Sequence, residues 1–300
     1  MPSSDSKYFI TGSSGFVGAS VLRFFGNEKF YRWERESNIK ILDVECVIHL
    51  AGKAHDLKKV SLPEDYYTVN TELTKKVFDA FLASNANVFI MLSSVKAVAD
   101  EVDKELTEDT IPNPITHYGK SKLLAEQYIL SQQIPEGKRV YILRPCMIHG
   151  PSNKGNLNLL YNLVSKGFPW PLGIYENARS YLSIKNLCFI INELIEKEYI
   201  PSGVYNVADD DPLSTNEVIQ LIAESKGKES RILKINKPLI TIFARMGDFL
   251  KLPINSERLR KLTESYVVSN AKIKAALKKP LPISSKEGLL KTFQSFSTNA

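Results

Sequence analysis

Short apolar runs alternate with longer amphipathic segments through the first half of the chain. A short apolar run is typical of a buried strand, whereas an apolar face that recurs every three or four residues is typical of a helix. Strands are therefore predicted over residues 7–10, 46–50, 87–93 and 139–144, and helices over roughly 16–27, 64–84 and 115–133. This alternation favours an α/β fold in which helices cover both faces of a parallel sheet.

The pattern changes after Gly150 and Pro151. Strict alternation ends there, and Pro, Gly and Asn become frequent in GPSNKGN and GFPWPLG. We therefore expect a first domain over residues 1–150 and a smaller carboxyl-terminal lobe over residues 151–300. A chain of 300 residues that is 43% hydrophobic is long enough for one large core and a second, smaller one.

A glycine-rich turn, TGSSGFVG, follows the first predicted strand. Gly12, Gly15 and Gly18 have the spacing GxxGxxG, and residues 17–25 are predicted to form the helix that follows. Backbone N–H groups at the start of a helix bind phosphate, so this turn is a candidate site for the pyrophosphate of a dinucleotide. Taken alone, such a glycine run is also compatible with an ordinary turn.

Tyr118 and Lys122 are four residues apart in HYGKSK, on a predicted helix. Residues at that spacing share one helix face, so the Lys122 ammonium can lie beside the Tyr118 phenol. A neighbouring cation lowers the pKa of a phenol, and a lowered pKa suits a group that must give or take a proton. The plainer interpretation is a half-buried ring next to a solvated ammonium.

The order of these motifs favours catalysis over the plainer interpretations. A strand, the glycine turn and a helix come first, HLAG and LSSV each follow a later strand, and YGKSK lies on the next helix. Together they predict hydride transfer to or from a carbonyl, with a nicotinamide as the hydride carrier and Tyr118 as the proton carrier.

Six segments occur in an order that is known from one protein family. They are VIHLAG (47–52), YYTVNTELTKKVFDA (66–80), MLSSVKA (91–97), YGKSKLLAE (118–126), LRPCMIHGP (143–151) and RSYLSIKNL (179–187). On these segments the chain resembles, over nearly its whole length, the extended short-chain dehydrogenase/reductase family of NAD-dependent epimerases, dehydratases and reductases. It is most similar to bacterial UDP-glucose 4-epimerase-like proteins and to 4-ketoreductases that form UDP-N-acetylquinovosamine.

The resemblance has consequences for the fold. It implies a Rossmann-type, doubly wound parallel sheet with a smaller carboxyl-terminal substrate lobe. It also implies that the chain returns to the first, NAD(P)-binding domain around residues 180–200 before it ends in the lobe.

The resemblance further implies roles for three side chains. Tyr118 gives its proton to the C4 oxygen of the sugar as hydride arrives, and Ser94 hydrogen-bonds to the same oxygen. Lys122 holds the nicotinamide ribose. Ser93 is an alternative to Ser94, because a serine pair at the end of a strand can also cap a loop. The second serine of the pair is the one that matches the family.

NAD or NADP is the cofactor that the resemblance implies. The residues expected to bind it are Gly12, Ser14, Gly15, Phe16, Val17, Gly18, Leu50, Ala51, Gly52, Asn70, Tyr118, Lys122 and Pro145.

The segment between the first helix and VIHLAG departs from the family pattern. It has twenty residues, NEKFYRWERESNIKILDVEC (27–46), where a full Rossmann half has two strands and a helix. Glu34 or Glu36 can bind the adenine ribose of NAD, whereas Arg32 or Arg35 can bind the 2′-phosphate of NADP, and both alternatives stay open. The shortening also predicts that the adenine half of the cofactor is held loosely.

Four side chains are expected to bind the substrate. Arg179 is predicted to chelate the diphosphate of a UDP-sugar, because a guanidinium can bind two phosphate oxygens at once. His55 and Asn156 match family positions near the substrate, and Lys96 is expected to contact the substrate or the phosphates of the cofactor. A solvated lysine and a helix cap are the alternatives for Lys96 and Asn156. Dehydratases carry an Asp and a Glu where this chain has Val95 and Lys96, so dehydration is disfavoured.

The remaining polar residues suggest structural roles. His49 lies in an apolar strand run and is predicted to be a buried histidine with satisfied hydrogen bonds. The three aspartates at 209–211 precede a proline and are typical of a polar turn. The spacing of His, Cys, Asp and Glu is not that of metal ligands, so we expect no metal.

Charge and cysteine content indicate the cellular setting. Cys46, Cys146 and Cys188 lie in apolar runs, which favours reduced thiols in the cytoplasm. Neither a signal peptide nor a run long enough to span a membrane is expected. The formal net charge is +6, and lysines are frequent in the last third of the chain. A solvated surface explains them, and attraction to an anionic membrane or to the UDP of the substrate is the alternative.

The sequence therefore predicts a cytoplasmic nucleotide-sugar oxidoreductase. The favoured reaction is NAD(P)H-dependent reduction of a UDP-4-keto-6-deoxy-hexosamine in surface polysaccharide synthesis, and the alternative is 4-epimerisation of a UDP-hexose or UDP-N-acetylhexosamine. A non-catalytic sensor or scaffold is a third interpretation, against which the complete set of Ser94, Tyr118 and Lys122 argues. The expected partner is the UDP-sugar, with a homodimer as an allowed assembly, and neither nucleic-acid binding nor membrane insertion is expected.

Overall fold

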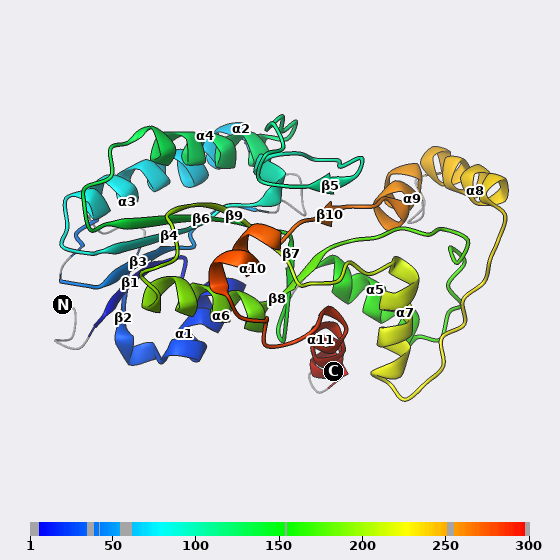
Figure 1. The fold of residues 1–300 in the computed structure, drawn as a ribbon. Coiled ribbons are helices and arrows are strands. Elements are labelled where there is room, and N and C mark those ends of the chain that lie inside the picture. The colour runs from blue at the N-terminus through cyan, green and yellow to red at the C-terminus, as the bar shows by residue number, and fades with distance from the viewer. Residues whose placement is uncertain are drawn as a thin grey trace.

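A parallel six-stranded sheet forms the centre of the amino-terminal half of the molecule (Figure 1). The computed structural model describes residues 6–34, 39–41, 43–54, 62–153, 155–250 and 255–297. Within them the strands of this sheet are β1 (Tyr8–Thr11), β2 (Phe30–Arg32), β3 (Cys46–His49), β4 (Val88–Leu92), β6 (Arg139–Pro145) and β9 (Gly203–Val207). Their order is β2-β1-β3-β4-β6-β9, and every neighbouring pair is parallel. The predicted α/β fold class is confirmed.

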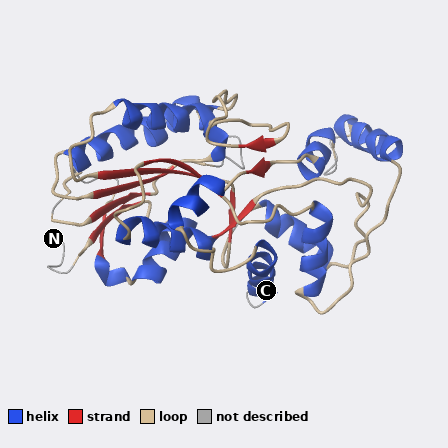
Figure 2. Cartoon of the chain, viewed as in Figure 1, coloured by secondary structure: helices blue, strands red, loops and turns tan. Residues whose placement is uncertain are grey.

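Helices cover both faces of this sheet (Figures 1 and 2). One face carries α1 (Phe16–Phe25) and α6 (Ile184–Glu196), and the other carries α2 (Pro63–Tyr66), the π-helical segment η2 (Tyr67–Glu72), α3 (Leu73–Leu82) and α4 (His117–Ser131). Neighbouring residues of β3 point to opposite layers: Ile48 packs in the same cluster as Val21 of α1, and Val47 in the same cluster as Phe78 of α3. Burial on both faces explains why the strands are continuous apolar runs in the sequence.

The carboxyl-terminal lobe lies beyond the carboxyl ends of the strands and is mainly helical (Figure 1). Its helices are α5 (Asn156–Ser165), α7 (Thr215–Glu224), α8 (Lys237–Phe249), α9 (Ser256–Thr263) and α11 (Ser285–Ser297). Two pairs of short parallel strands lie where it meets the sheet domain. They are β7 (Met147–His149) with β8 (Tyr181–Ser183), and β5 (Glu105–Leu106) with β10 (Val267–Val268). The chain returns to the sheet through α6 and β9, and α10 (Ala271–Leu277) packs against β9.

The short segment between α1 and β3 forms few elements of secondary structure, as its length predicts. It contains the 3-10 helix η1 (Asn27–Lys29) and β2, and no strand of the described part of the chain lies beyond β2. Arg32 donates to Oδ1 of Asn27 at 3.0 Å. Glu34 is the second residue after β2, whereas Arg35 and Glu36 lie outside the described residues.

His49 is a fully buried histidine at the end of β3. Its Nδ1 lies 2.7 Å from Oγ1 of Thr11, and its Nε2 lies 2.9 Å from Oγ1 of Thr74. Burial, with a smaller contribution from the nearby Lys122 ammonium, lowers the pKa of His49 to about 3. The predicted buried histidine with satisfied hydrogen bonds is confirmed.

The prediction of a polar turn at residues 209–211 is wrong for Asp209, which is only 2% exposed. Its carboxylate accepts hydrogen bonds from the backbone N–H of Ser183, at 3.0 and 3.1 Å, and from Nδ2 of Asn186 at 2.7 Å. Ser183 caps the amino end of α6, where a negative charge is favourable because of the free N–H groups of the helix. Buried Asp209 therefore stabilises the amino end of α6.

A buried ion pair ties helix α4 to the sheet. Glu126 of α4 is 0% exposed and Arg144 of β6 is 5% exposed. Arg144 donates through Nε to both carboxylate oxygens, at 3.1 and 3.0 Å, and through Nη2 to Oε2 at 2.6 Å. The Ser93 hydroxyl donates to Oε1 of the same carboxylate. This geometry satisfies both charges inside the protein.

We expect Glu126→Ala to lower the free energy of unfolding by about 3–5 kcal/mol, because it leaves the Arg144 charge buried without a partner. Urea unfolding followed by circular dichroism measures the loss. The double variant Glu126→Met/Arg144→Met removes both charges and should recover most of the stability. A loss below about 1 kcal/mol in the single variant, as for an exposed ion pair, would contradict this interpretation.

The lowered pKa of His49 predicts a loss of stability in mild acid. Between the ordinary pKa of 6.5 and the folded-state pKa of about 3, the unfolded chain binds a proton at His49 that the folded chain does not bind. Stability contributed by neutral His49 is thus complete above pH 6.5 and decreases as the pH falls, by about 2 kcal/mol at pH 5.

The measurement is the free energy of unfolding at pH 7.5 and at pH 5 for the wild-type protein and for His49→Gln. The wild-type protein should lose about 2 kcal/mol more than the variant over this interval. His117→Gln, at an exposed position on α4, serves as the control. Equal losses in the wild-type protein and His49→Gln would show that His49 does not carry the pH dependence.

Candidate active site

The glycine turn lies between β1 and α1 and is packed tightly against the loop that follows β3. Gly12 has a φ of +71°, and a Cβ there would lie 2.6 Å from the backbone nitrogen of Ala51. A Cβ at Gly18 would lie 2.2 Å from the carbonyl oxygen of Gly12. The Thr11 hydroxyl accepts from the N–H of Ala51 at 3.2 Å and so joins the two segments. Glycine is required at both positions because backbone occupies the space of a side chain.

The start of helix α1 is suited to an anion. Its amino-terminal cap is Gly15, which offers no side-chain hydrogen bond, and the first turn contains no acidic residue. The N–H groups of that turn are therefore available to phosphate oxygens. Ser14 is exposed beside them, and Phe16 and Val17 pack partly against the core. The residues present thus fit the pyrophosphate of a dinucleotide.

Asn70 holds the loop after β3 against helix α4. It is fully buried in the π-helical segment η2, and its Oδ1 accepts from the N–H of Lys53 at 2.8 Å. Its Nδ2 donates to the carbonyl of Lys53 at 3.1 Å and to Oγ of Ser121 at 2.9 Å. All of these partners belong to the protein, so Asn70 positions Gly52 and its neighbours. A π-helical turn often occurs at functional sites.

Lys122 lies under this loop, buried to 4% exposure. Its Nζ donates to the carbonyl of Leu92 at 2.9 Å, and a Cβ at Gly52 would lie 3.0 Å from Nζ. Burial lowers the pKa of Lys122 to about 8, and the Glu126 carboxylate opposes this shift. The ammonium thus lies between the end of β4 and the loop after β3.

Tyr118 and Ser94 form a hydrogen-bonded pair at the carboxyl edge of the sheet. Ser94 follows β4 and caps the short helix η3 (Val95–Ala97), where its Oγ accepts from the N–H of Lys96 at 3.1 Å. The pKa of Tyr118 is raised, chiefly by burial and also by the Glu126 charge, while the hydrogen bond with Ser94 lowers it. The sequence predicted a pKa lowered by Lys122. The structure differs because burial outweighs the other influences and Lys122 hydrogen-bonds to Leu92.

The two serines after β4 have different environments. The Ser93 hydroxyl belongs to the buried Glu126–Arg144 pair, whereas the Ser94 hydroxyl lies beside Tyr118. Ser93 is thus committed to the scaffold and Ser94 is turned toward the phenol, in agreement with the choice made from the sequence.

Lys96 and Arg179 come together on the side of the lobe. Nζ of Lys96 donates to the carbonyl of Asp100 at 2.7 Å and lies 4.0 Å from the ring centre of Tyr266. Lys96 is therefore not a solvated loop lysine. Burial lowers its pKa, the carboxylates of Asp100 and Glu264 oppose this shift, and the nearby Arg179 charge adds to it. Arg179 donates to the carbonyl of Lys261, and its Nη2 lies 3.6 Å from a carboxylate oxygen of Glu264.

Four other predicted site residues remain to be placed. His55 lies outside the described residues. Asn156 is the first residue of α5, whose amino-terminal cap is Gly155, so the helix-cap alternative for Asn156 is wrong; its contact with the substrate stays a prediction. Pro145 is the last residue of β6, and Leu50 follows β3, where its N–H donates to the carbonyl of Thr11 at 3.2 Å.

Sequence reasoning missed three residues of the site region. Glu126 is four residues from Lys122 on the same helix face, so a carboxylate there was a usable signal. Tyr266 and Glu264 come from a distant part of the chain, and their contacts with Lys96 and Arg179 depend on the fold of the lobe. No local pattern marks them.

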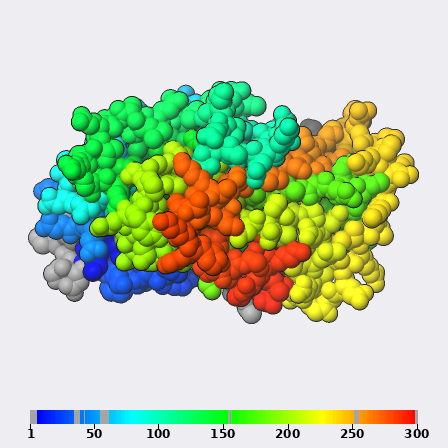
Figure 3. Space-filling model, viewed as in Figure 1, coloured from blue at the N-terminus to red at the C-terminus, as the bar shows by residue number. Residues whose placement is uncertain are grey.

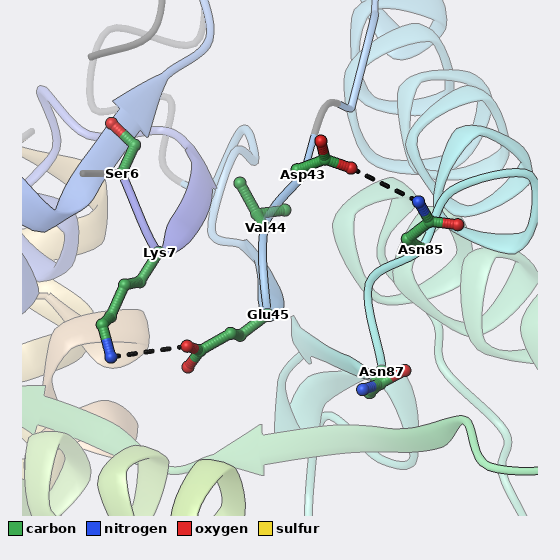
Figure 4. Close-up of a pocket in the computed structure, with 7 residues that line it drawn as sticks. All are labelled: Ser6, Lys7, Asp43, Val44, Glu45, Asn85 and Asn87. Carbon is green, nitrogen blue, oxygen red and sulfur yellow. Dashed lines mark hydrogen bonds and ion pairs between the residues drawn. The ribbon is translucent and has the colours of Figure 1, made fainter. Parts of the chain in front are cut away.

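A hollow at the opposite ends of the strands is separate from this site (Figure 4). It is lined by Ser6, Lys7, Asp43, Val44, Glu45, Asn85 and Asn87. These residues precede β1, β3 and β4, so the hollow lies at the amino ends of the strands. Ligands of open parallel sheets bind at the carboxyl ends, where Gly12, Ser94 and Gly52 lie.

Membrane insertion was not expected from the sequence. In the part of the chain that the structure describes, no helix has both the length and the apolar character needed to cross a bilayer.

Comparisons with known proteins agree with this geometry. Residues 8–208 match the model of the NAD dependent epimerase/dehydratase family. The chain is 28% identical to a UDP-glucose 4-epimerase of Vibrio cholerae, over 96% of this chain and 94% of the relative. It is 26% identical to an N-acetyl-α-D-glucosaminyl-diphospho-ditrans,octacis-undecaprenol 4-epimerase of Escherichia coli O157:H7, over 90% of this chain and 85% of the relative.

A solved structure shows the same fold. The crystal structure of a UDP-N-acetylglucosamine 4-epimerase from Bacillus cereus superposes with a TM-score of 0.74 at 21% identity, covering 98% of this chain and 97% of that one. The family match covers more than half of the chain and includes the glycine turn, Ser94, Tyr118 and Lys122. The chain therefore belongs to the NAD-dependent epimerase/dehydratase family of extended short-chain dehydrogenases/reductases, and it is an NAD(P)-dependent enzyme.

Proposed function

We propose that this enzyme reduces the 4-keto group of a sugar that is linked to a nucleoside diphosphate, with a UDP-4-keto-6-deoxy-hexosamine as the substrate. The observation that carries the proposal is the Ser94–Tyr118 pair at the carboxyl edge of the sheet, with Lys122 behind it. The bound nicotinamide supplies the hydride. The glycine turn and the loop around Gly52 hold the dinucleotide, and Lys122 holds its ribose.

Tyr118 is the proton donor in this proposal. Its raised pKa keeps the phenol protonated at neutral pH, which suits a group that must give a proton to the C4 oxygen. The Ser94 hydroxyl orients the same oxygen and stabilises the charge that develops on it. Reduction of a ketone therefore begins from the protonation state that the site favours.

Arg179 is the proposed ligand of the diphosphate. Its guanidinium lies at the lobe side of the site, next to Lys96, so two cations are near each other. Glu264 lies 3.6 Å from Arg179 and competes with a diphosphate for it. The proposal therefore assigns cofactor binding mainly to residues 1–150 and substrate binding mainly to residues 151–300.

4-Epimerisation is a second candidate. It is favoured by the similarity to the relatives from Vibrio cholerae and Escherichia coli. Both of these proteins are 4-epimerases, and this chain covers 94% and 85% of their lengths. Epimerisation uses the same three side chains, but it returns the hydride to the other face of C4 and keeps the cofactor bound. On the adenine side, β2 is the one described strand beyond β1, so the cofactor is expected to be held loosely there. Loose binding supports reduction, because a reductase must exchange its cofactor in every turnover.

Three buried, unpaired cysteines, Cys46, Cys146 and Cys188, support a cytoplasmic location for this reaction.

Replacement of Tyr118 tests the proposed chemistry. Tyr118→Phe should lower turnover by about 10²- to 10⁴-fold, because only the proton donor is removed. Binding of reduced cofactor, measured by fluorescence, should stay near the wild-type value. Tyr128→Phe, on the same helix but outside the site, should be fully active. A Tyr118→Phe variant with more than about a tenth of the wild-type rate would remove Tyr118 from the reaction.

The same assay separates the two candidate reactions. A reductase consumes one reduced nicotinamide per UDP-4-keto-6-deoxy sugar, so absorbance of the reduced cofactor falls with product formation. Conversion of UDP-N-acetylglucosamine to UDP-N-acetylgalactosamine at constant absorbance would instead establish the epimerase.

Arg179→Ala should weaken binding of UDP by about 1.5–3 kcal/mol, the usual contribution of a charge-assisted hydrogen bond. Glu264→Gln should strengthen UDP binding, since it removes the competing carboxylate. Isothermal calorimetry measures both, and Arg231→Ala, an exposed arginine of the same lobe, is the control. If UDP binds Arg179→Ala and the wild-type protein equally, Arg179 is not its ligand.

A further inference from the structure

Helix α8 presents a continuous apolar face to solvent. Six apolar side chains of α8 and its carboxyl end are between 50% and 87% exposed: Leu239, Ile242, Phe243, Met246, Phe249 and Leu250. Their spacing of three and four residues places them on one side of the helix. Single exposed apolar residues are ordinary, whereas six on one helix face form a patch that indicates an interaction surface.

The opposite side of α8 is packed into the lobe. Ile240 is 8% exposed and Ala244 is 1% exposed. Ile240 belongs to an apolar cluster with Trp170 and Ile219. At the other end of the helix, Asp248 accepts from the N–H of Ser256 at 3.0 Å, which joins α8 to α9. The apolar face is therefore exposed while the helix is already anchored.

The patch lies at one extremity of the molecule. Figure 1 shows α8 at the tip of the lobe, at the end opposite to the amino-terminal edge of the sheet. In the space-filling view, the yellow to gold segment that includes α8 forms that end of the visible face (Figure 3). A surface at a tip can meet a large flat partner without a clash elsewhere.

The net positive charge of the chain lies in α8, α9 and the segment that precedes α8 in the sequence. Residues 226–250 and 255–261 contain nine basic and three acidic side chains, a net charge of +6, which equals the formal net charge of the whole chain. The nine are all exposed: Lys226, Lys228, Arg231, Lys234, Lys237, Arg245, Arg258, Arg260 and Lys261. The rest of the molecule is thus neutral on balance. Of the nine, Lys237 and Arg245 belong to α8 itself, and Arg258, Arg260 and Lys261 belong to α9, which packs on α8.

We propose that α8 docks the substrate lobe onto an anionic phospholipid membrane. A helix that combines an apolar face containing Phe and Leu with surrounding Lys and Arg lies in the plane of the interface, with the apolar side chains among the acyl chains and the cations at the headgroups. Arg245 lines an apolar hollow with Ile242, Met246, Phe249 and Leu250, so its stem can follow the apolar face while its guanidinium reaches a lipid phosphate.

Docking has a consequence for the proposed substrate site. The carbonyl of Lys261, in α9, accepts from Arg179, and α9 packs on α8. Membrane attachment through α8 therefore positions the end of the lobe that carries the proposed diphosphate ligand. The inference goes beyond the proposed reaction and does not require it, so membrane binding and turnover can fail separately.

Vesicle sedimentation tests the proposal with the full chain. Wild-type protein should bind vesicles of phosphatidylcholine and phosphatidylglycerol, and it should bind vesicles of phosphatidylcholine alone at least about tenfold more weakly. The double variant Phe243→Ser/Phe249→Ser should lose at least about tenfold in affinity for the anionic vesicles, because two aromatic rings no longer enter the interface. Phe24→Ser/Leu130→Ser removes two exposed apolar residues of the sheet domain and should bind like the wild-type protein.

A second pair of variants tests the charge contribution. Arg231→Glu/Lys234→Glu, close to α8, should weaken binding to the anionic vesicles, whereas Lys29→Glu/Lys76→Glu changes the net charge equally at distant positions and should weaken it much less. Cofactor binding and thermal melting of each variant show that it is folded.

Two results would overturn the proposal. One is the absence of binding of the wild-type protein to the anionic vesicles. The other is a dimer, measured by analytical ultracentrifugation, that Phe243→Ser/Phe249→Ser dissociates while vesicle binding is unaffected, since α8 would then be an interface between two copies of the chain.

Discussion

The buried ion pair between Glu126 and Arg144 holds helix α4 against the sheet, and the geometry of the candidate active site follows from it. Arg144 is at the carboxyl end of β6, and Glu126 is one and two turns along α4 from Lys122 and Tyr118. Because the pair is nearly inaccessible to water and bonded through three contacts, α4 has little freedom to rotate or slide. The positions of the phenol and the ammonium relative to β4 are therefore set by charges that take no part in the reaction.

The same carboxylate balances the electrostatics of the site. Burial lowers the pKa of Lys122 to about 8, and Glu126 raises it. Glu126 also raises the pKa of Tyr118, so that one buried charge favours both the protonated ammonium and the protonated phenol. Both groups therefore keep their protons in the same buried environment, which is the state that the proposed reduction of a ketone requires.

Most of the sheet domain could be predicted because each of its elements is marked by a pattern within one short stretch of the sequence. The strands at residues 46–50, 87–93 and 139–144 were placed to within one or two residues, since burial on both faces produces continuous apolar runs. The glycine turn was predictable for a similar reason: backbone contacts at Gly12 and Gly18 exclude any side chain. The lowered pKa expected for Tyr118 was wrong in direction, because spacing on a helix reports proximity and not the depth of burial.

The contacts of the lobe could not be predicted in this way. Lys96 and Tyr266 are in contact although they are 170 residues apart in the sequence. Asp209 has the sequence context of a turn residue, and only the fold shows that it binds the amino end of α6. These arrangements depend on which elements the fold brings together. In each of them a polar group is buried with a partner from a distant segment, so a pattern in one short stretch carries no trace of the pairing.

The departures of this chain from a complete Rossmann enzyme lie at its two ends, and the catalytic centre between them is intact. At one end β2 is the last strand of the sheet among the described residues, and the prediction that the adenine half of the cofactor is held loosely depends on this short segment. At the other end α8 exposes apolar side chains amid the net positive charge of the chain. Ser94 follows β4, and Tyr118 and Lys122 lie on α4; the contacts described for these three residues involve neither β2 nor α8. The proposed cofactor exchange at one end and the proposed membrane attachment at the other can therefore vary without moving Ser94, Tyr118 and Lys122.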